Sequence, residues 1–263
     1  MINIVPNKLK KNIKGITPNK FTNKRIYHAI VTVLMIFITL IELFPIYLIV
    51  VNSVKTLGNF VDDPLGLPQV FALKINYSYV IEKMEYFLSL KNTVIILLPA
   101  LLSIIICGAM AGFVISRRRS KLNNTIYTIF VLGIALPTFT MLYPQLRLLT
   151  NLKIRNNILG LVLVYTANGI PMSLFLYTGF FGSVPKELEE ASMLDGCGLI
   201  RCFFQIFFPL AAATTATLVM LQSIGIWNDV QLPRLVFVNK SSMQTLMPML
   251  NAFYGRQVGQ GTR

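Results

Sequence analysis

The chain has 263 residues, of which 54% are hydrophobic and 13% are charged. Soluble domains carry about 25% charged residues, so this composition excludes an ordinary soluble domain and predicts a protein built for lipid. The formal net charge is +14, which in a soluble basic domain would favour nucleic acid as a partner. Because most basic residues here fall between apolar blocks, they favour contact with the membrane surface, and no nucleic acid is expected.

Five long apolar stretches predict transmembrane helices. Each provides about the 20 residues that a helix needs to cross a bilayer. Lipid offers no partners to the backbone, so such stretches are expected to be helical. We expect spans at about 29–54, 93–116, 125–146, 157–184 and 203–228. The first is too long for the apolar core of a signal peptide, and no small-residue cleavage site follows it. The predicted fold is an all-α polytopic membrane helix bundle.

The distribution of lysine and arginine predicts the orientation of the spans. Residues 1–28 form a basic tail, which is therefore placed in the cytoplasm of a protein of the cell membrane. Arg117, Arg118, Arg119 and Lys121 mark a second cytoplasmic loop and are interpreted as a solvated, lipid-facing anchor. Two spans later, the loop 185–202 must also be cytoplasmic, although it is acidic. This exception needs an explanation of its own.

Two further features accompany the first span. Glu42 is the one ionisable residue deep within a predicted span, and such residues are candidate functional sites. The alternative is that it lies near the outer end and reaches water, since Pro45 follows. In the outer loop 55–92, apolar residues recur at helical spacing from Tyr77 to Leu88. That pattern predicts an amphipathic helix, which either lies on the outer face or packs on the spans.

Sequence motifs for catalysis are missing. The chain has no phosphate-binding loop of the GxxxxGK[ST] type and no HExxH zinc motif. Its single histidine, His28, falls at the membrane edge, and three scattered cysteines do not make a disulfide framework. We therefore expect no enzyme, no cofactor and no metal site.

The acidic loop reads "GSVPKELEEASMLDGCG" and predicts a short helix that ends in a glycine turn. Pro185 suits the first helical turn, and the glutamates that follow it favour the positive end of the helix. Gly196 is expected to end the helix in the left-handed conformation. A second helical stretch then leads through Pro209 into the fifth span. Such a loop is either a surface connector with solvated carboxylates or a docking element for a partner.

The segment "EASMLDG", followed nine residues later by "IFFP", resembles the EAA motif of ABC importer permeases, E-A-A-x3-G-x9-I-x-L-P. Ser192 replaces the second alanine and Phe208 replaces the leucine. "WNDVQLP" at 227–233 and "QTLMPMLNAFYG" at 244–255 resemble the carbohydrate-importing, maltose-permease-like branch. The resemblance implies a coupling helix between spans four and five, with an ATPase-coupling interface made of Glu190, Ala191, Ser192, Asp195, Gly196, Ile206 and Pro209.

The same resemblance implies the partners and the task. The chain would be one permease subunit that pairs with a second permease subunit, presents its loop to separate ABC ATPase subunits and receives a sugar from an extracytoplasmic binding protein. Trp227, Asn228 and Asp229 could line the sugar path, or could form an interfacial tryptophan with capping neighbours. Residues 230–263 are expected to lie outside and to lead to a sixth span that this sequence lacks. The alternative function is a self-contained channel or secondary transporter, whose acidic loop is only a linker.

Overall fold

The computed structural model describes residues 19–118, 120–238 and 240–260. The first part of the basic tail, from Met1 to Pro18, and Arg119 lie outside the described residues. Over the described ranges the regular structure is helical and contains no strand, which confirms the all-α prediction. The chain divides into two compact units, Met1–Tyr79 and Val80–Arg263.

The first unit consists of one long helix and a compact turn. α1 (Asn19–Ser53) is apolar all round, and none of its best membrane-spanning window is buried within the protein. It is followed by α2 (Leu57–Asp62) and by α3 (Leu73–Lys83), which continues into the second unit. The Asn76 side chain donates to the carbonyls of Ser53 and Lys55, at 3.0 and 2.8 Å. These bonds satisfy carbonyls at the end of α1, where no further helical turn supplies backbone N–H donors.

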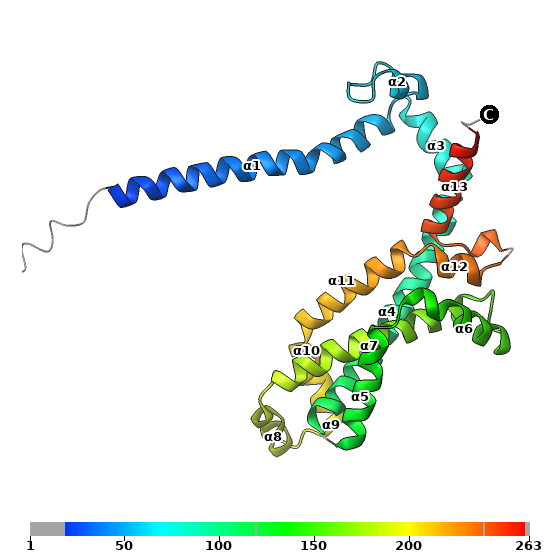
Figure 1. Ribbon diagram of the computed structural model, residues 1–263. Helices are drawn as coiled ribbons and strands as arrows, with labels where there is room; N and C mark the ends of the chain where they lie inside the picture. Colours follow the sequence, from blue (N-terminus) through cyan, green and yellow to red (C-terminus); the bar gives the residue numbers. More distant parts are fainter. Residues whose placement is uncertain (1–18, 119, 239, 261–263) are drawn as a thin grey trace, which may run out of the picture. The chain divides into compact units, whose positions relative to one another are not determined.

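Two helices, α4 (Tyr86–Arg117) and α7 (Ile158–Ser183), form the centre of the second unit and pack along their length (Figure 1). Small residues make this close approach possible. A Cβ on Gly108 would lie 1.8 Å from the Ser173 hydroxyl, and one on Gly112 would lie 2.8 Å from the Tyr177 Cβ. Glycines spaced four residues apart are a common way to bring two membrane helices together.

Two of the predicted spans are broken rather than straight. α5 (Lys121–Ile134) and α6 (Thr138–Asn151) meet at a bend of 108°. The second break is a bend of 72° between α11 (Ala212–Asn228) and the helical segment before it. That segment consists of α9 (Leu199–Cys202), the π-helix η2 (Phe203–Phe207) and α10 (Phe208–Leu210). Pro137 and Pro209 lie at these breaks, where proline removes a backbone donor. Three straight helices and these two bent pairs account for up to five membrane spans by length and composition.

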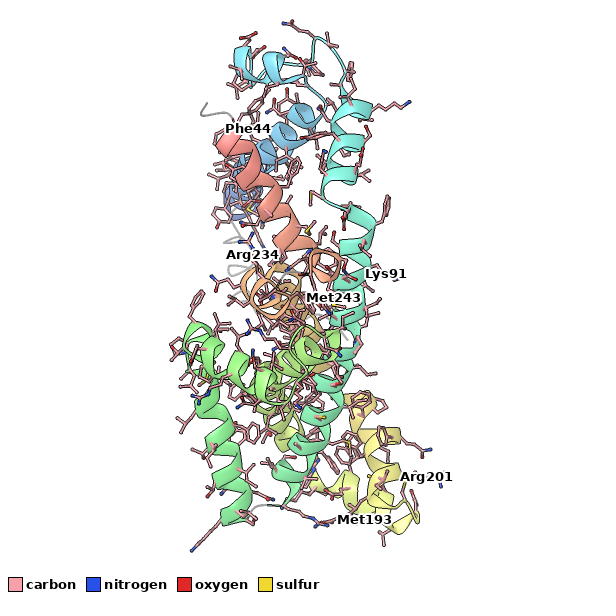
Figure 2. The ribbon with its side chains drawn as sticks, turned by 90° about the vertical axis from the view of Figure 1, so that its right-hand side faces the viewer. Phe44, Lys91, Met193, Arg201, Arg234 and Met243 are labelled. Atoms are coloured by element: carbon pink, nitrogen blue, oxygen red, sulfur yellow. The ribbon has the colours of Figure 1, made fainter. Side chains whose placement is uncertain are left out.

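The two ends of the second unit carry different elements. At one end α8 (Lys186–Leu194) connects α7 to α9. Toward the other end lie α12 (Gln231–Val236), the 3₁₀ turn η3 (Ser241–Met243) and α13 (Leu246–Gln260). Asn92 ties the segment before α13 to α4 by donating to the carbonyls of Ser242 and Gln244, at 2.8 and 3.1 Å. Figure 2 shows the same separation, with Met193 and Arg201 far from Met243 and Lys91.

The close approach of α4 and α7 leads to a stability prediction. Gly112→Ala should destabilise the protein by about 1–3 kcal/mol, because the new methyl group overpacks the interface against Tyr177. Gly179→Ala is the matched control, since that helical glycine has no atom within 4 Å of the added Cβ, and alanine favours helix by about 1 kcal/mol. Chemical unfolding in detergent measures both, and equal stability of the two variants would contradict the proposed packing.

Candidate functional site

α8 and the turn after it have the conformation that the sequence predicts for the acidic loop. Gly196 has a φ of +78°, in the left-handed region. The amide of Cys197 donates to the carbonyl of Ser192, and the amide of Gly196 donates to that of Met193, both at 3.0 Å. These two bonds form a Schellman motif, which closes the helix with its own backbone. Pro185 lies one residue earlier than predicted, at the N-cap rather than in the first turn.

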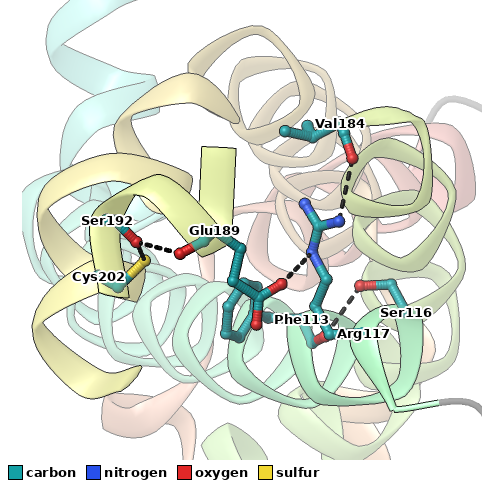
Figure 3. A network of polar contacts seen from close by, with 7 residues as sticks. All are labelled: Phe113, Ser116, Arg117, Val184, Glu189, Ser192 and Cys202. Carbon is teal, nitrogen blue, oxygen red and sulfur yellow. Dashed lines mark hydrogen bonds and ion pairs between the residues drawn. The ribbon is translucent and has the colours of Figure 1, made fainter. Parts of the chain in front are cut away.

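One arginine fastens α8 to the rest of the unit (Figure 3). Arg117, at the end of α4, forms an ion pair with Glu189 of α8 at 3.3 Å, and the two side chains are only 6% and 16% exposed. Its Nη1 donates to the carbonyl of Val184, the C-cap residue of α7, at 3.0 Å. Its guanidinium also lies 4.7 Å from the centre of the Phe207 ring in the π-helix. One side chain thus connects α4 with α7, α8 and η2.

The position of Arg117 corrects the interpretation of the basic run as a solvated anchor. Arg117 is buried, whereas the neighbouring Arg118 is exposed. A charge taken out of water requires a partner of opposite charge and hydrogen bonds. Glu189 supplies the charge and the Val184 carbonyl supplies one hydrogen bond, while Nη2 is buried with no hydrogen-bond partner among the described residues. This arginine therefore belongs to the site, although the sequence placed it outside. A basic residue at the end of an apolar stretch gives no sign of a partner so distant in sequence.

Ser192 holds the same face of α8 about one turn after Glu189. This residue is 5% exposed, and its hydroxyl lies 2.7 Å from the carbonyl oxygen of Glu189 and 2.9 Å from the sulfur of the fully buried Cys202. The contact links α8 to the end of α9, which confines this position to a small side chain. Substitution of the second alanine of the EAA motif by serine therefore keeps the packing and adds one side-chain contact.

The remaining predicted residues, with one exception, are exposed. Glu190, Ala191, Asp195 and Gly196 are exposed on α8 and its turn. Leu194 and Ile200 are 89% and 75% exposed beside them. Ile206 is half-buried within the π-helix, whereas Pro209, in α10 next to the break of the last span, is exposed. The loop thus presents carboxylates and large apolar side chains on one face while its other face is held.

The second predicted region, 227–229, lies beside a cavity of about 540 Å³. Asn228 and Asp229 line this cavity, but Trp227 does not. The carboxylate of Asp229 accepts bonds from the amides of Gln231 and Leu232, at 2.8 and 3.2 Å, and from the Tyr165 hydroxyl at 3.0 Å. It therefore caps the start of α12 and anchors it to α7, which agrees with the capping alternative.

Comparison with known proteins identifies the family. The model of the family described as "Binding-protein-dependent transport system inner membrane component" matches residues 104–255. The melibiose/raffinose/stachyose import permease protein MelC of Bacillus subtilis is 31% identical, covering 86% of this chain and 81% of that protein. The probable starch degradation products transport system permease protein AmyC of Thermoanaerobacterium thermosulfurigenes is 32% identical, covering 88% of this chain and 83% of that protein.

A solved structure is similar in fold. A chain of a bacterial ABC transporter involved in the import of the acidic polysaccharide alginate superposes with a TM-score of 0.72. It shares 19% sequence identity and covers 87% of this chain and 79% of its own length. The chain described here belongs to the family of binding-protein-dependent transport system inner membrane components. It is a multi-pass membrane transport component rather than an enzyme, and its family works with ATPase subunits, a substrate-binding protein and a partner permease.

The arginine junction leads to a prediction about the loop. Arg117→Met leaves Glu189 half-buried without its partner, so α8 should open more often. We expect hydrogen exchange of the backbone amides of residues 189–194 to rise at least tenfold, which corresponds to about 1.4 kcal/mol. Mass spectrometry of the intact protein measures this rate.

Two variants control the experiment. Arg118→Met removes an exposed neighbouring charge and should leave exchange in α8 unchanged. In the double variant Arg117→Met/Glu189→Met no charge is left unpaired, so protection should return toward that of the parent protein. Equal exchange in Arg117→Met and Arg118→Met would show that the junction does not hold α8.

Proposed function

We propose that this chain is a permease subunit of an ATP-driven importer that carries a sugar or oligosaccharide across the cell membrane, and that α8 with its turn receives the ATPase subunit. One observation carries the proposal: α8 is held rigidly on one face by Arg117 and Ser192, while its other face is exposed. A helix that must transmit movement needs both properties. The sugar is proposed from the relatives, whose names describe melibiose, raffinose, stachyose, starch products and diacetylchitobiose.

The exposed face has the chemistry of a docking surface. Leu194 and Ile200 present large apolar side chains, 89% and 75% exposed, and such side chains are a source of binding energy when a partner buries them. Glu190 and Asp195 lie beside them and can pair with basic groups of a partner. Apart from Glu189, which pairs with Arg117, the loop carries three carboxylates against the two basic residues Lys186 and Arg201. The surface therefore suits a partner whose cleft is apolar with a basic rim.

Movement of this loop would reach the spans through the junction described above. Arg117 connects α8 with α4, with the end of α7 and with the π-helix that leads into α11. A displacement of α8 by ATP-driven closure of the ATPase subunits would therefore act on three spans together. Energetic coupling requires an element with two states that both sites bias, and the two bent spans are the candidates for that element.

A self-contained channel or secondary transporter is the alternative. It would need no partner at α8, and the carboxylates would then be solvated parts of a connector. The exposed apolar side chains Leu194 and Ile200 are unfavourable in a connector that faces only water. They favour the docking function over the alternative.

A second permease subunit is also proposed, together with an external sugar-binding protein. α1 is apolar all round and exposes most of its side chains from Ile26 to Val50, so lipid or a partner helix must surround it. The substrate path in this proposal runs along the cavity that Asn228 lines. Trp227 lies outside that cavity, so we assign it no contact with the sugar.

The docking function predicts the effect of a change at the most exposed leucine of the loop. Leu194→Asp should leave the fold intact, because the side chain is 89% exposed, and should weaken binding of the ATPase subunits at least tenfold. Leu152→Asp is the control, since that leucine is 57% exposed and precedes the opposite end of α7. Co-purification with the ATPase subunits of the same operon, followed by ATP-dependent sugar uptake, measures the effect. Unchanged binding by the Leu194 variant would argue for the connector.

The orientation is proposed as well, with the amino terminus and α8 in the cytoplasm. A cysteine introduced at Lys153, in the turn before α7, should react with a membrane-impermeant thiol reagent in intact cells. Cys197, in the turn after α8, should react only after the membrane is permeabilised. The reverse labelling pattern would invert the topology and remove α8 from the side where ATP is found.

A further inference from the structure

Two adjoining cavities in the second unit share one set of polar side chains. The larger encloses about 540 Å³ between α6, α7, α11 and the start of α12, and the smaller encloses about 340 Å³ between the break of α5 and α6 and the same two helices α7 and α11. Thr138, Asn168 and Gln222 line both cavities. Together they form a continuous hollow beside the broken span.

The amides of this hollow lie within membrane spans. Asn168 is near the middle of α7, Gln222 is in the second half of α11, and Gln145 is in α6. Polar side chains within spans are costly in lipid, and they mark water-filled paths or solute sites. The hollow is therefore expected to face water or a solute rather than acyl chains.

The amides are only partly satisfied by the protein. Gln145 Nε2 donates to Asn168 Oδ1 at 2.7 Å, and the Gln145 Oε1 is buried without a hydrogen-bond partner among the described residues. Gln222 makes no side-chain hydrogen bond within the part of the chain that the structure describes. Its carboxamide packs where Gly169 lacks a side chain, since a Cβ there would lie 3.2 Å from Gln222 Oε1. A carboxamide carries two N–H donors and an acceptor oxygen, so groups outside the Gln145–Asn168 bond remain to meet a ligand.

The hollow has no charge available for a ligand. Asp229 is the one ionisable carboxylate on its wall, and the Tyr165 hydroxyl and two backbone amides already occupy it. No lysine or arginine of the described residues lines either cavity. Carboxylate or phosphate groups are usually recognised by such basic side chains. Phe139, which is 70% exposed, adds an apolar ring to the wall.

We propose that Gln145, Asn168 and Gln222 form a contact site for an uncharged, polyhydroxylated solute on its way through the membrane. Hydroxyl groups both donate and accept, so they match carboxamides, while the C–H faces of a sugar ring suit the ring of Phe139. The site selects neutral sugars and rejects uronates and phosphorylated sugars, because burying their charge without a basic partner is unfavourable. The inference rests on the proposed function, whose substrate class it narrows.

The first test uses the whole complex in proteoliposomes, with its ATPase subunits, partner permease and binding protein. Uptake is measured for neutral oligosaccharides, represented by raffinose, maltotriose and chitobiose derivatives, and for oligomers of galacturonate and mannuronate. Transport of neutral sugars alone supports the site. Comparable transport of the uronates overturns it while leaving the importer function intact. ATP-independent uptake, or no uptake of any of these sugars, overturns the proposed function itself.

The second test changes the amides one at a time. Asn168→Leu and Gln222→Leu should each lower uptake of the best neutral sugar at least tenfold, while ATP hydrolysis stimulated by the loaded binding protein stays within twofold, because α8 is unchanged. Thr217→Val is the matched control on α11, since its hydroxyl bonds to the carbonyl of Ala213 and lines neither cavity. If both leucine variants transport as well as this control, the amides do not contact the solute.

Discussion

The arrangement of the elements around α8 depends on the guanidinium of Arg117. This group is almost completely buried, and it makes an ion pair with α8, a hydrogen bond to the end of α7 and a cation–π contact with the π-helix. Such a buried charge is stable only when its partners stay in place. The partners are therefore held relative to one another, and the opposite face of α8 remains exposed.

The breaks in two spans have a common consequence. The 108° bend between α5 and α6 directs α6 away from the line of α5, and the smaller cavity lies beside this bend, next to Thr138. The second break lies two residues after Pro209, between the segment that follows α8 and the helix α11, which carries Gln222. α11 thus begins after the segment that follows α8 and carries Gln222 to the amide-lined hollow. A displacement of α8 can therefore reach the hollow along a continuous stretch of backbone.

Sequence reasoning succeeded where the information is local. Gly196 ends α8 as expected, because few other residues adopt a positive φ readily. Apolar length was enough to predict the helical spans, since lipid imposes that structure. It failed for Arg117, whose partners at Val184 and Glu189 are distant in the chain, and for the hollow, whose amides come from three separate helices. Pro137 indicated a weak point in its span, but the size of the bend depends on tertiary packing.

The distance in sequence between Arg117 and its partners also bears on how the protein is made. Val184 follows Arg117 by 67 residues, and at about 5–20 residues per second its synthesis takes about 3 to 13 s longer. During that interval the arginine has none of its later contacts, so it remains hydrated at the membrane surface. With the orientation proposed above, it helps to retain the end of α4 in the cytoplasm while the next spans are inserted. The same side chain would first orient a nascent helix and later fasten the finished loop.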